Sequence, residues 1–183
     1  NDFGNLTSRT VTMIGKFLKG RIETPEKKGG MDDHVEDTVM KLIAEYQREM
    51  DVFGFHKALQ SIFEIISVLN RYIDSEAPWK LAKEGDLPRL NTVLHTLCQV
   101  LRTAAILVSP FMPSTARKME EQLGLKDLVA PGGRDAFCWD ESITGASVHK
   151  GEVLFPRIDL KVWEEEKAAR DAKKGLLPDP GDH

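Results

Sequence analysis

Apolar residues recur along the first 124 residues at intervals of three, four and seven, the spacing that places them on one side of an α-helix. This pattern predicts an all-α fold, a bundle of about five helices with an extended C-terminal arm and a tail helix. The five apolar stripes lie within residues 5–20, 32–50, 58–73, 87–109 and 113–124. The third stripe is strongly apolar, and we expect Phe63 to be among its inward-facing positions.

Proline, glycine and aspartate mark the breaks between these stripes. Pro78 predicts the start of a short helical turn, because proline is favoured at the first position of a helix, and Gly85 ends it. Asp86 can cap the long helix that follows, and Asp32 or Asp33 can cap the second helix. The helices should therefore be separate, with defined ends.

The pattern changes after Gly124, so we divide the chain into four parts. Residues 1–124 form the predicted bundle, and residues 125–151 have the composition of an irregular loop region. Residues 152–174 contain a short extended arm, "EVLFPRID", and a charged helix, "LKVWEEEKAARDAKK". Residues 175–183 read as a linker or a disordered tail.

The overall composition is that of a globular protein, with 41% hydrophobic and 30% charged residues. Apolar runs such as "AAILV" are far shorter than the ~20 residues of a membrane helix, so no membrane span is expected. The two cysteines form no C-x-x-C pair; we expect Cys98 to be buried, and a reducing cytoplasm fits. The chain begins inside a helical pattern without a signal peptide, which suggests a fragment.

Charge is unevenly distributed along a chain whose net charge is −4. Residues 1–31 and 77–126 each carry a net charge of +3, whereas residues 32–76 carry −6 and residues 127–183 carry −4. Two basic segments can form a local basic face on an acidic protein, which permits nucleic acid as a partner. Charges scattered over a solvated surface are the alternative, and the distribution alone does not exclude it.

Two short elements could carry chemistry. Asn5 and Arg9 are four residues apart, so they share one face of the first helix and could together read the edge of a base. On spacing alone, an ordinary surface pair is the preferred interpretation. Trp79 directly follows Pro78 at a break between two helices, where a ring is presented rather than buried in a stripe. A ring packed in a niche at the helix corner is the alternative.

Four segments give the chain a family resemblance. They are "FGNLTSRTVTMIGKF", "ALQSIFEIISVLNRYIDSEAPWKLAK", "LRTAAILVSPFMPSTARKMEEQLG" and "LFPRID". In this order they resemble the anticodon-binding domain of methionyl-tRNA synthetases, from residue 1 to about residue 166. The N-x-x-x-R element is shared by several class I synthetases, whereas "APWKLAK", "SPFMP" and "LFPRID" together are more discriminating.

The resemblance implies that the partner is the anticodon loop of a methionine tRNA. By analogy, Trp79 stacks on the first anticodon base, a cytosine, and Asn5 and Arg9 contact anticodon bases. Asp74 either holds the shape of the site or touches a base, and Pro78 restricts the chain before the ring. Stacking on an aromatic ring distinguishes bases poorly, so hydrogen bonds must select the cytosine.

The resemblance also implies what this chain does not do. The family's catalytic elements, H-I-G-H-like and K-M-S-K-S-like, are absent from the sequence, so no catalytic residue, cofactor or metal is expected here. ATP, and zinc in some members, would belong to the catalytic part of the parent enzyme. The arm at residues 152–166 would return toward that catalytic domain. Leu154 and Phe155 either anchor it there or pack on this bundle.

Two other interpretations remain open at the level of sequence. The chain could be the equivalent domain of a leucyl-, isoleucyl-, valyl- or cysteinyl-tRNA synthetase, which the A-P-W and L-F-P-R-I-D segments disfavour. It could instead be a helical protein-interaction module, with Trp79 and Leu81 as a hydrophobic hot spot. The sequence carries no signal for the oligomeric state.

Overall fold

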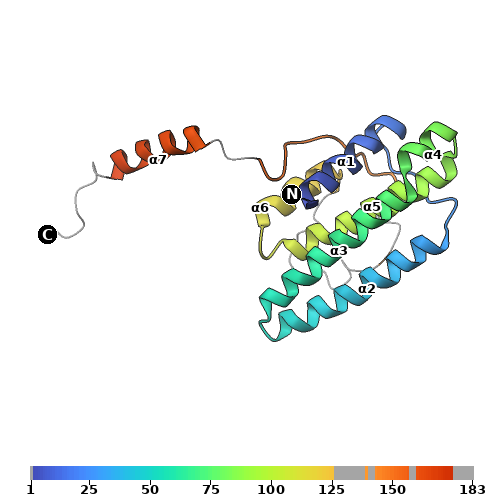
Figure 1. Ribbon diagram of the computed structural model, residues 1–183, viewed down its shortest axis with the longest axis horizontal. Helices are drawn as coiled ribbons and strands as arrows, with labels where there is room; N and C mark the ends of the chain where they lie inside the picture. The colour runs from blue at the N-terminus through green and yellow to red at the C-terminus, as the bar shows by residue number, and fades with distance from the viewer. Residues whose placement is uncertain (1, 126–138, 140–142, 157–159, 175–183) are drawn as a thin grey trace.

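The computed structural model describes residues 2–125, 139, 143–156 and 160–174, and its regular elements are all helices. These are α1 (Asp2–Phe17), α2 (Gly30–Asp51), α3 (Phe55–Glu76), α4 (Pro78–Glu84), α5 (Leu87–Val108), α6 (Pro113–Gln122) and α7 (Leu160–Lys174). Helices α1–α6 form a bundle, and α7 stands apart from it (Figure 1). The predicted all-α fold is confirmed. The predicted tail at 175–183 and most of the predicted loop region lie outside the described residues.

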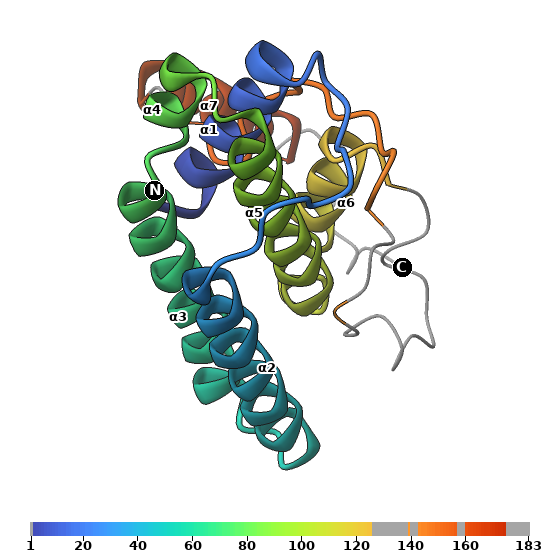
Figure 2. The same ribbon diagram turned by 90° about the vertical axis from the view of Figure 1, so that its right-hand side faces the viewer.

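Helix α5 is the central element of the bundle. Every residue from Leu90 to Val108 is buried, and α3 and α6 pack against this helix (Figure 2). By length and composition alone, α5 could cross a membrane. However, 89% of its most apolar window is buried inside the bundle, which is what the core helix of a helical bundle requires.

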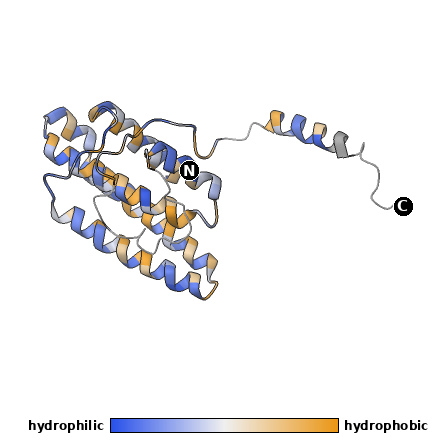
Figure 3. Ribbon diagram, turned by 180° about the vertical axis from the view of Figure 1, so that it is seen from behind, coloured by the Kyte–Doolittle hydropathy of each residue, from blue (hydrophilic) through white to orange (hydrophobic). Residues whose placement is uncertain are grey.

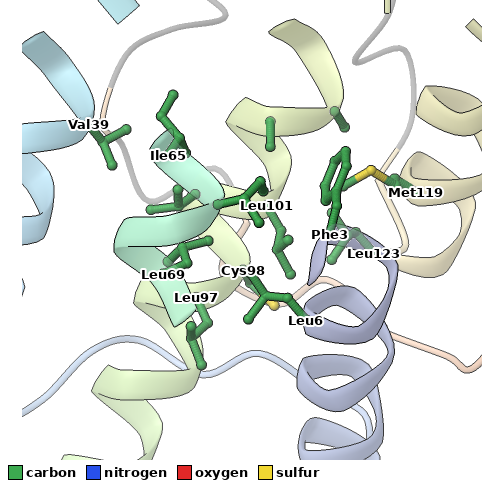
Figure 4. Packing of buried hydrophobic residues seen from close by; sticks show 14 of the residues in the cluster. Phe3, Leu6, Val39, Ile65, Leu69, Leu97, Cys98, Leu101, Met119 and Leu123 are labelled. Atoms are coloured by element: carbon green, nitrogen blue, oxygen red, sulfur yellow. The ribbon is translucent and has the colours of Figure 1, made fainter. Parts of the chain in front are cut away.

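The core draws one apolar stripe from each of the helices that surround α5. Figure 4 shows its centre, made of Phe3, Leu6, Val39, Ile65, Leu69, Leu97, Cys98, Leu101, Met119 and Leu123. Each fully buried aliphatic side chain of this kind stabilises the fold by about 1.5–3 kcal/mol. Cys98 is buried as predicted, and its burial raises the pKa of the thiol.

One core prediction is wrong. Phe63 is exposed, because it lies about 140° around α3 from Ala58, which is buried near the middle of the apolar stripe. Figure 3 shows how hydrophobic and hydrophilic residues alternate along the bundle helices, as such one-sided stripes require. The apolar periodicity predicts α3 correctly, but the predicted buried stripe includes one residue too many.

Aspartates cap two of the helices. The Asp86 carboxylate accepts the backbone N–H of Arg89 at 3.2 Å, which confirms its predicted role at the start of α5. Helix α2 begins earlier than predicted, at Gly30, so Asp32 lies within its first turn. From there the Asp32 carboxylate accepts the N–H of Gly29 at 2.7 Å. Asp32 therefore caps α2 from inside the helix rather than from the position before it.

Part of the predicted loop region is tied to the bundle. The backbone N–H of Ile22 donates to the carbonyl of Ala146 at 3.1 Å, and the N–H of Val148 donates to the carbonyl of Gly20 at 2.7 Å. Ile143 and Val148 are buried in the core cluster. This pairing joins residues that are more than 120 positions apart, which no local composition could indicate.

The arm after this region packs on the bundle itself. Leu154 is buried, and the Phe155 ring lies 6.1 Å from the Phe3 ring between centroids. Gly4 makes this approach possible, since a Cβ atom there would lie 3.0 Å from the Phe155 ring. Among the two alternatives for these residues, the structure therefore favours packing on the bundle. Residues 157–159 of the arm lie outside the described part, and the side chains of 160–170 in α7 are exposed.

Candidate functional site

A sharp turn between α3 and α4 presents Trp79. Ala77 adopts a left-handed conformation with φ 45° and ψ 60°, and its N–H donates to the carbonyl of Ile73 to end α3. The Ala77 carbonyl then accepts the N–H of Lys80 at 2.7 Å, which starts α4. Pro78 is buried at the first position of the new helix, and Trp79 beside it is 43% exposed. The ring is thus presented at the surface, as the sequence predicted.

Helix α1 brings Arg9 to this ring. Its guanidinium lies over the Trp79 ring, 5.9 Å from the ring centroid, and its Nη2 donates to Oδ1 of Asp74 at 3.2 Å. Leu6 and Ile14 of α1 are buried in the core, which fixes the direction of the exposed face of this helix. Arg9 therefore connects the exposed end of α3 with the start of α4.

The five predicted site residues differ in how the structure places them. Arg9, Asp74 and Trp79 form one contact group. Asn5 is exposed one helical turn before Arg9, so it extends the same face of α1, although no contact joins it to the other three in the described structure. Pro78 is buried at the start of α4 and therefore does not itself present a surface.

The group is suited to hold a planar, polar ligand. A half-exposed indole can stack on an aromatic base, and a guanidinium and two polar side chains can pair with base edges. The Arg9–Asp74 ion pair is solvent-exposed, with side chains 44% and 67% accessible, and such pairs contribute only about 0–1 kcal/mol. Arg9 can therefore exchange Asp74 for a ligand at little cost.

A pocket of about 710 Å³ adjoins the group on the Asp74 side. It is lined by Asp2, Phe3, Phe63, Ile66, Ser67, Asn70, Asp74, Met112 and Phe155. Asn70 was not among the predicted site residues, although it lies one helical turn before Asp74 and shares its face of α3. That four-residue spacing was the available signal. The amide of Asn70 donates to the carbonyl of Ile66 at 3.0 Å, which orients its side chain toward the helix.

No other kind of site stands out in the part of the chain that the structure describes. Those residues contain no group of three or more His, Cys, Asp or Glu that could hold a metal ion. His95 is buried, and its Nε2 lies 3.3 Å from the Thr144 hydroxyl, in agreement with a structural role. The Arg9–Trp79–Asp74 group is thus the best candidate for function.

Comparison with known proteins gives this group a context. Residues 23–173 match the family model described as the anticodon-binding domain of methionyl-tRNA ligase. The chain is 41% identical over 180 residues to the methionine–tRNA ligase of Caldanaerobacter subterraneus, covering 94% of this chain and 26% of that protein. It is 41% identical over 182 residues to the enzyme of Lactococcus lactis, covering 98% of this chain and 27% of that protein.

Solved structures agree with these matches. The apo form of Mycobacterium tuberculosis methionyl-tRNA synthetase superposes with a TM-score of 0.77 at 31% identity, covering 87% of this chain and 32% of that one. The chain thus spans only about a quarter to a third of the proteins it matches. The Lactococcus match reaches into α1, which lies before the region of the family model. The predicted family is confirmed: this chain belongs to the anticodon-binding domain family of methionyl-tRNA ligase.

Proposed function

We propose that this chain binds the anticodon loop of a methionine tRNA through the face formed by α1 and the start of α4. One observation carries the proposal: Arg9 lies over the Trp79 ring while its guanidinium is paired with Asp74. An exposed aromatic ring, a planar cation and a carboxylate therefore share one surface. Single-stranded bases are recognised by this combination of stacking and base-edge hydrogen bonds.

Each residue has a separate role in this proposal. Trp79 stacks on the first anticodon base, a cytosine, and contributes affinity with little selectivity. Arg9 and Asn5 supply hydrogen bonds to base edges and therefore selectivity. Asp74 holds Arg9 in place until the base arrives. Pro78 fixes the backbone before the ring, so less conformational entropy is lost on binding.

The distribution of charge supports the same face. The two segments with a net charge of +3, residues 1–31 and 77–126, contain α1 and α4, which meet at the site. Lys80 and Lys83 are exposed on α4 and are placed to attract phosphate groups. Nucleic-acid binding of this kind weakens as the salt concentration rises. Binding releases cations that were condensed on the phosphates, and this release is less favourable when the solution already contains more salt.

The chemistry of the whole enzyme follows from the family. We infer that the full protein joins L-methionine to its tRNA with ATP, as a class I aminoacyl-tRNA synthetase of the cytoplasm, and that the ATP site lies outside this chain. The isolated chain should bind tRNA without catalysing adenylate formation. Neither a nucleotide-cradling loop nor a catalytic triad is present in its sequence.

Arg9→Ala tests the anticodon assignment. Binding should be measured for a methionine anticodon loop and for a loop with a changed first anticodon base, at two salt concentrations. Loss of a base-edge contact should reduce the difference in binding free energy between the two loops by about 1–3 kcal/mol. A uniform loss for both loops with a shallower salt dependence would mean that Arg9 touches only phosphate.

Arg71→Ala is the matched control for this experiment. Arg71 is an exposed arginine on α3, and it pairs with Glu64 at 3.2 Å, the same distance as in the Arg9–Asp74 pair. The two variants therefore lose the same charge and a comparable ion pair. Equal binding of both loops by the wild-type chain would refute the proposed function.

The arm at residues 152–166 supports a second contact, with the catalytic domain of the same enzyme. Leu154 and Phe155 pack on the bundle, but Leu160, Val162 and Trp163 of α7 are exposed apolar residues on a helix that stands apart (Figure 1). We propose that α7 rather than Leu154 or Phe155 meets that domain. Amide hydrogen exchange in α7 should be slower in the full-length enzyme than in this chain alone. Identical exchange would exclude the contact.

A further inference from the structure

The backbone that carries Trp79 needs external support. Ala77 has a positive φ of 45°, a conformation that costs a residue with a Cβ atom roughly 1–2 kcal/mol. Such conformations persist only where the surrounding structure holds them. Ala77 lies two residues before Trp79 and three after Asp74, so any relaxation here would move both side chains. Contacts from other elements must therefore hold this turn in place.

One side chain, Arg89 in the first turn of α5, contacts the turn directly. Its Nε donates to Oε2 of Glu76 at 3.0 Å, and its Nη2 forms an ion pair with the same oxygen at 2.7 Å. Glu76 is the last residue of α3 and immediately precedes Ala77. Both side chains are mostly buried, with 11% of Arg89 and 17% of Glu76 accessible. Charge-assisted hydrogen bonds from a planar guanidinium are among the most strongly oriented in proteins.

The same guanidinium is fixed from the other side. Its Nη1 donates to the Asp32 carboxylate in α2 and, at 3.0 Å, to the backbone carbonyl of Lys27. The Tyr72 hydroxyl of α3 donates to the same Asp32 carboxylate, which is buried. Arg89 therefore ties the loop before α2, the start of α2 and the end of α3 to the start of α5.

The ionisation of Asp32 agrees with the hydrogen bonds that its carboxylate accepts. Burial alone would raise the pKa of Asp32, but hydrogen bonds from Arg89, from Tyr72 and from the Gly29 backbone outweigh burial and hold this pKa below its usual value. Asp32 is thus charged near neutral pH. The Arg89 guanidinium therefore pairs with two carboxylates: its Nη1 pairs with Asp32, and its Nη2 pairs with Glu76.

We propose that Arg89 and Glu76 are positioning residues of the anticodon site, which hold the α3–α4 turn so that Trp79 and Asp74 keep their binding geometry. This inference rests on the proposed function of that site. Neither residue has to touch the RNA. A buried ion pair is a weak source of stability compared with apolar packing, but its directional hydrogen bonds fix the relative position of the elements that it joins.

Glu76→Ala is the decisive variant, because it frees the turn while leaving the Arg89–Asp32 pair intact. Glu64→Ala is its matched control: it changes the same charge on the same helix and breaks a pair with exposed Arg71. The chain has three tryptophans, so Trp139→Phe and Trp163→Phe leave Trp79 as the single tryptophan, whose emission can be excited apart from that of the two tyrosines. Circular dichroism and the urea midpoint report separately whether each variant remains folded.

Two results are expected for Glu76→Ala. The fluorescence anisotropy of Trp79 should fall and its quenching by acrylamide should rise, because the turn becomes more mobile. Binding of the methionine anticodon loop should weaken roughly three- to tenfold, a range typical of residues that act through others. The mismatched loop should also bind more weakly, because stacking on Trp79 hardly distinguishes bases. Glu64→Ala should change neither measurement. If Glu76→Ala fails to fold, Glu76→Gln, which keeps the shape, should show a smaller change in the same direction.

Different experimental results would overturn this proposal and the proposed function. A folded Glu76→Ala chain with unchanged Trp79 anisotropy and unchanged loop binding would overturn the positioning role. A wild-type chain that binds matched and mismatched loops equally would instead overturn anticodon recognition. The anisotropy comparison would then still decide whether Glu76 holds the turn.

Discussion

Replacing Trp79 by alanine separates the ring from the turn that presents it. Alanine is the best helix former, and Ala77 and Pro78 keep the backbone of the turn. Truncating a fully buried aromatic side chain costs about 3–5 kcal/mol of stability. Because 43% of Trp79 is exposed, the free energy of unfolding should fall by less, about 1–2 kcal/mol. The variant should therefore remain folded and report on binding.

The expected loss of binding free energy depends on which group contacts the Trp79 ring in the free chain and which one in the complex. One base stacked on an aromatic side chain contributes about 1–3 kcal/mol. In the free chain the ring already has Arg9 over it, 5.9 Å from the centroid, and an exposed contact of this kind contributes about 0.5–1 kcal/mol. A base that takes the place of Arg9 gains only the difference. From the middle of each range, we therefore expect the affinity for the methionine anticodon loop to fall by about 1–1.5 kcal/mol, or roughly 5- to 13-fold.

Trp163→Ala is a close control for this experiment. Trp163 in α7 is 42% exposed and also has a cation over its ring, the Lys167 ammonium at 5.3 Å. Fluorescence anisotropy of a labelled anticodon stem-loop gives both affinities, and a Trp79→Phe chain should lie between wild type and Trp79→Ala. Equal losses for the two alanine variants, or none for Trp79→Ala, would refute the stacking role.

Three further predictions concern the rest of the molecule. Asp32→Asn should lower the free energy of unfolding at pH 7 by about 1–3 kcal/mol. Because the folded-state pKa of Asp32 is depressed, its contribution is present above the unfolded pKa of about 3.9 and is lost as the pH falls below it. Urea unfolding at pH 7 and pH 3 should therefore show the difference from wild type shrinking in acid. Leu69→Ala should cost about 2–5 kcal/mol, because it leaves a cavity beside α5. In a Cys138→Ser background, Cys98 should react with a thiol reagent only as fast as the chain unfolds, since the thiol is buried and its pKa is raised.

Local signals in the sequence were sufficient for the helices. Apolar residues at helical spacing gave the order and approximate bounds of α1, α2, α3, α5 and α6, because each stripe lies within one continuous segment. Pro78 and Asp86 marked the starts of α4 and α5 for reasons contained in two or three residues. Phe63 shows the limit of this reasoning. Periodicity identifies the apolar side of a helix, but the neighbouring helices decide how wide the buried stripe is.

The candidate site was identified in the sequence only through family resemblance. On its own spacing, the Asn5–Arg9 pair was better explained as an ordinary surface pair, and a lone tryptophan after a proline has several explanations. The packing of α1 against α3 and α5 placed Arg9 over Trp79 and beside Asp74, 65 residues away. The roles of these residues in binding stay predictions.

The Arg89 cluster could be recognised only in the tertiary structure. Asp32, Glu76 and Arg89 are charged residues that lie 44 and 13 positions apart, and each one alone is indistinguishable in sequence from a solvated surface charge. Burial turns them into a single group, because desolvated charges must find partners with defined geometry. The sequence by itself determined where helices form and which side of each is apolar, because these properties depend on neighbours in the chain. The tertiary structure alone decided which charges meet, because that depends on how the helices pack.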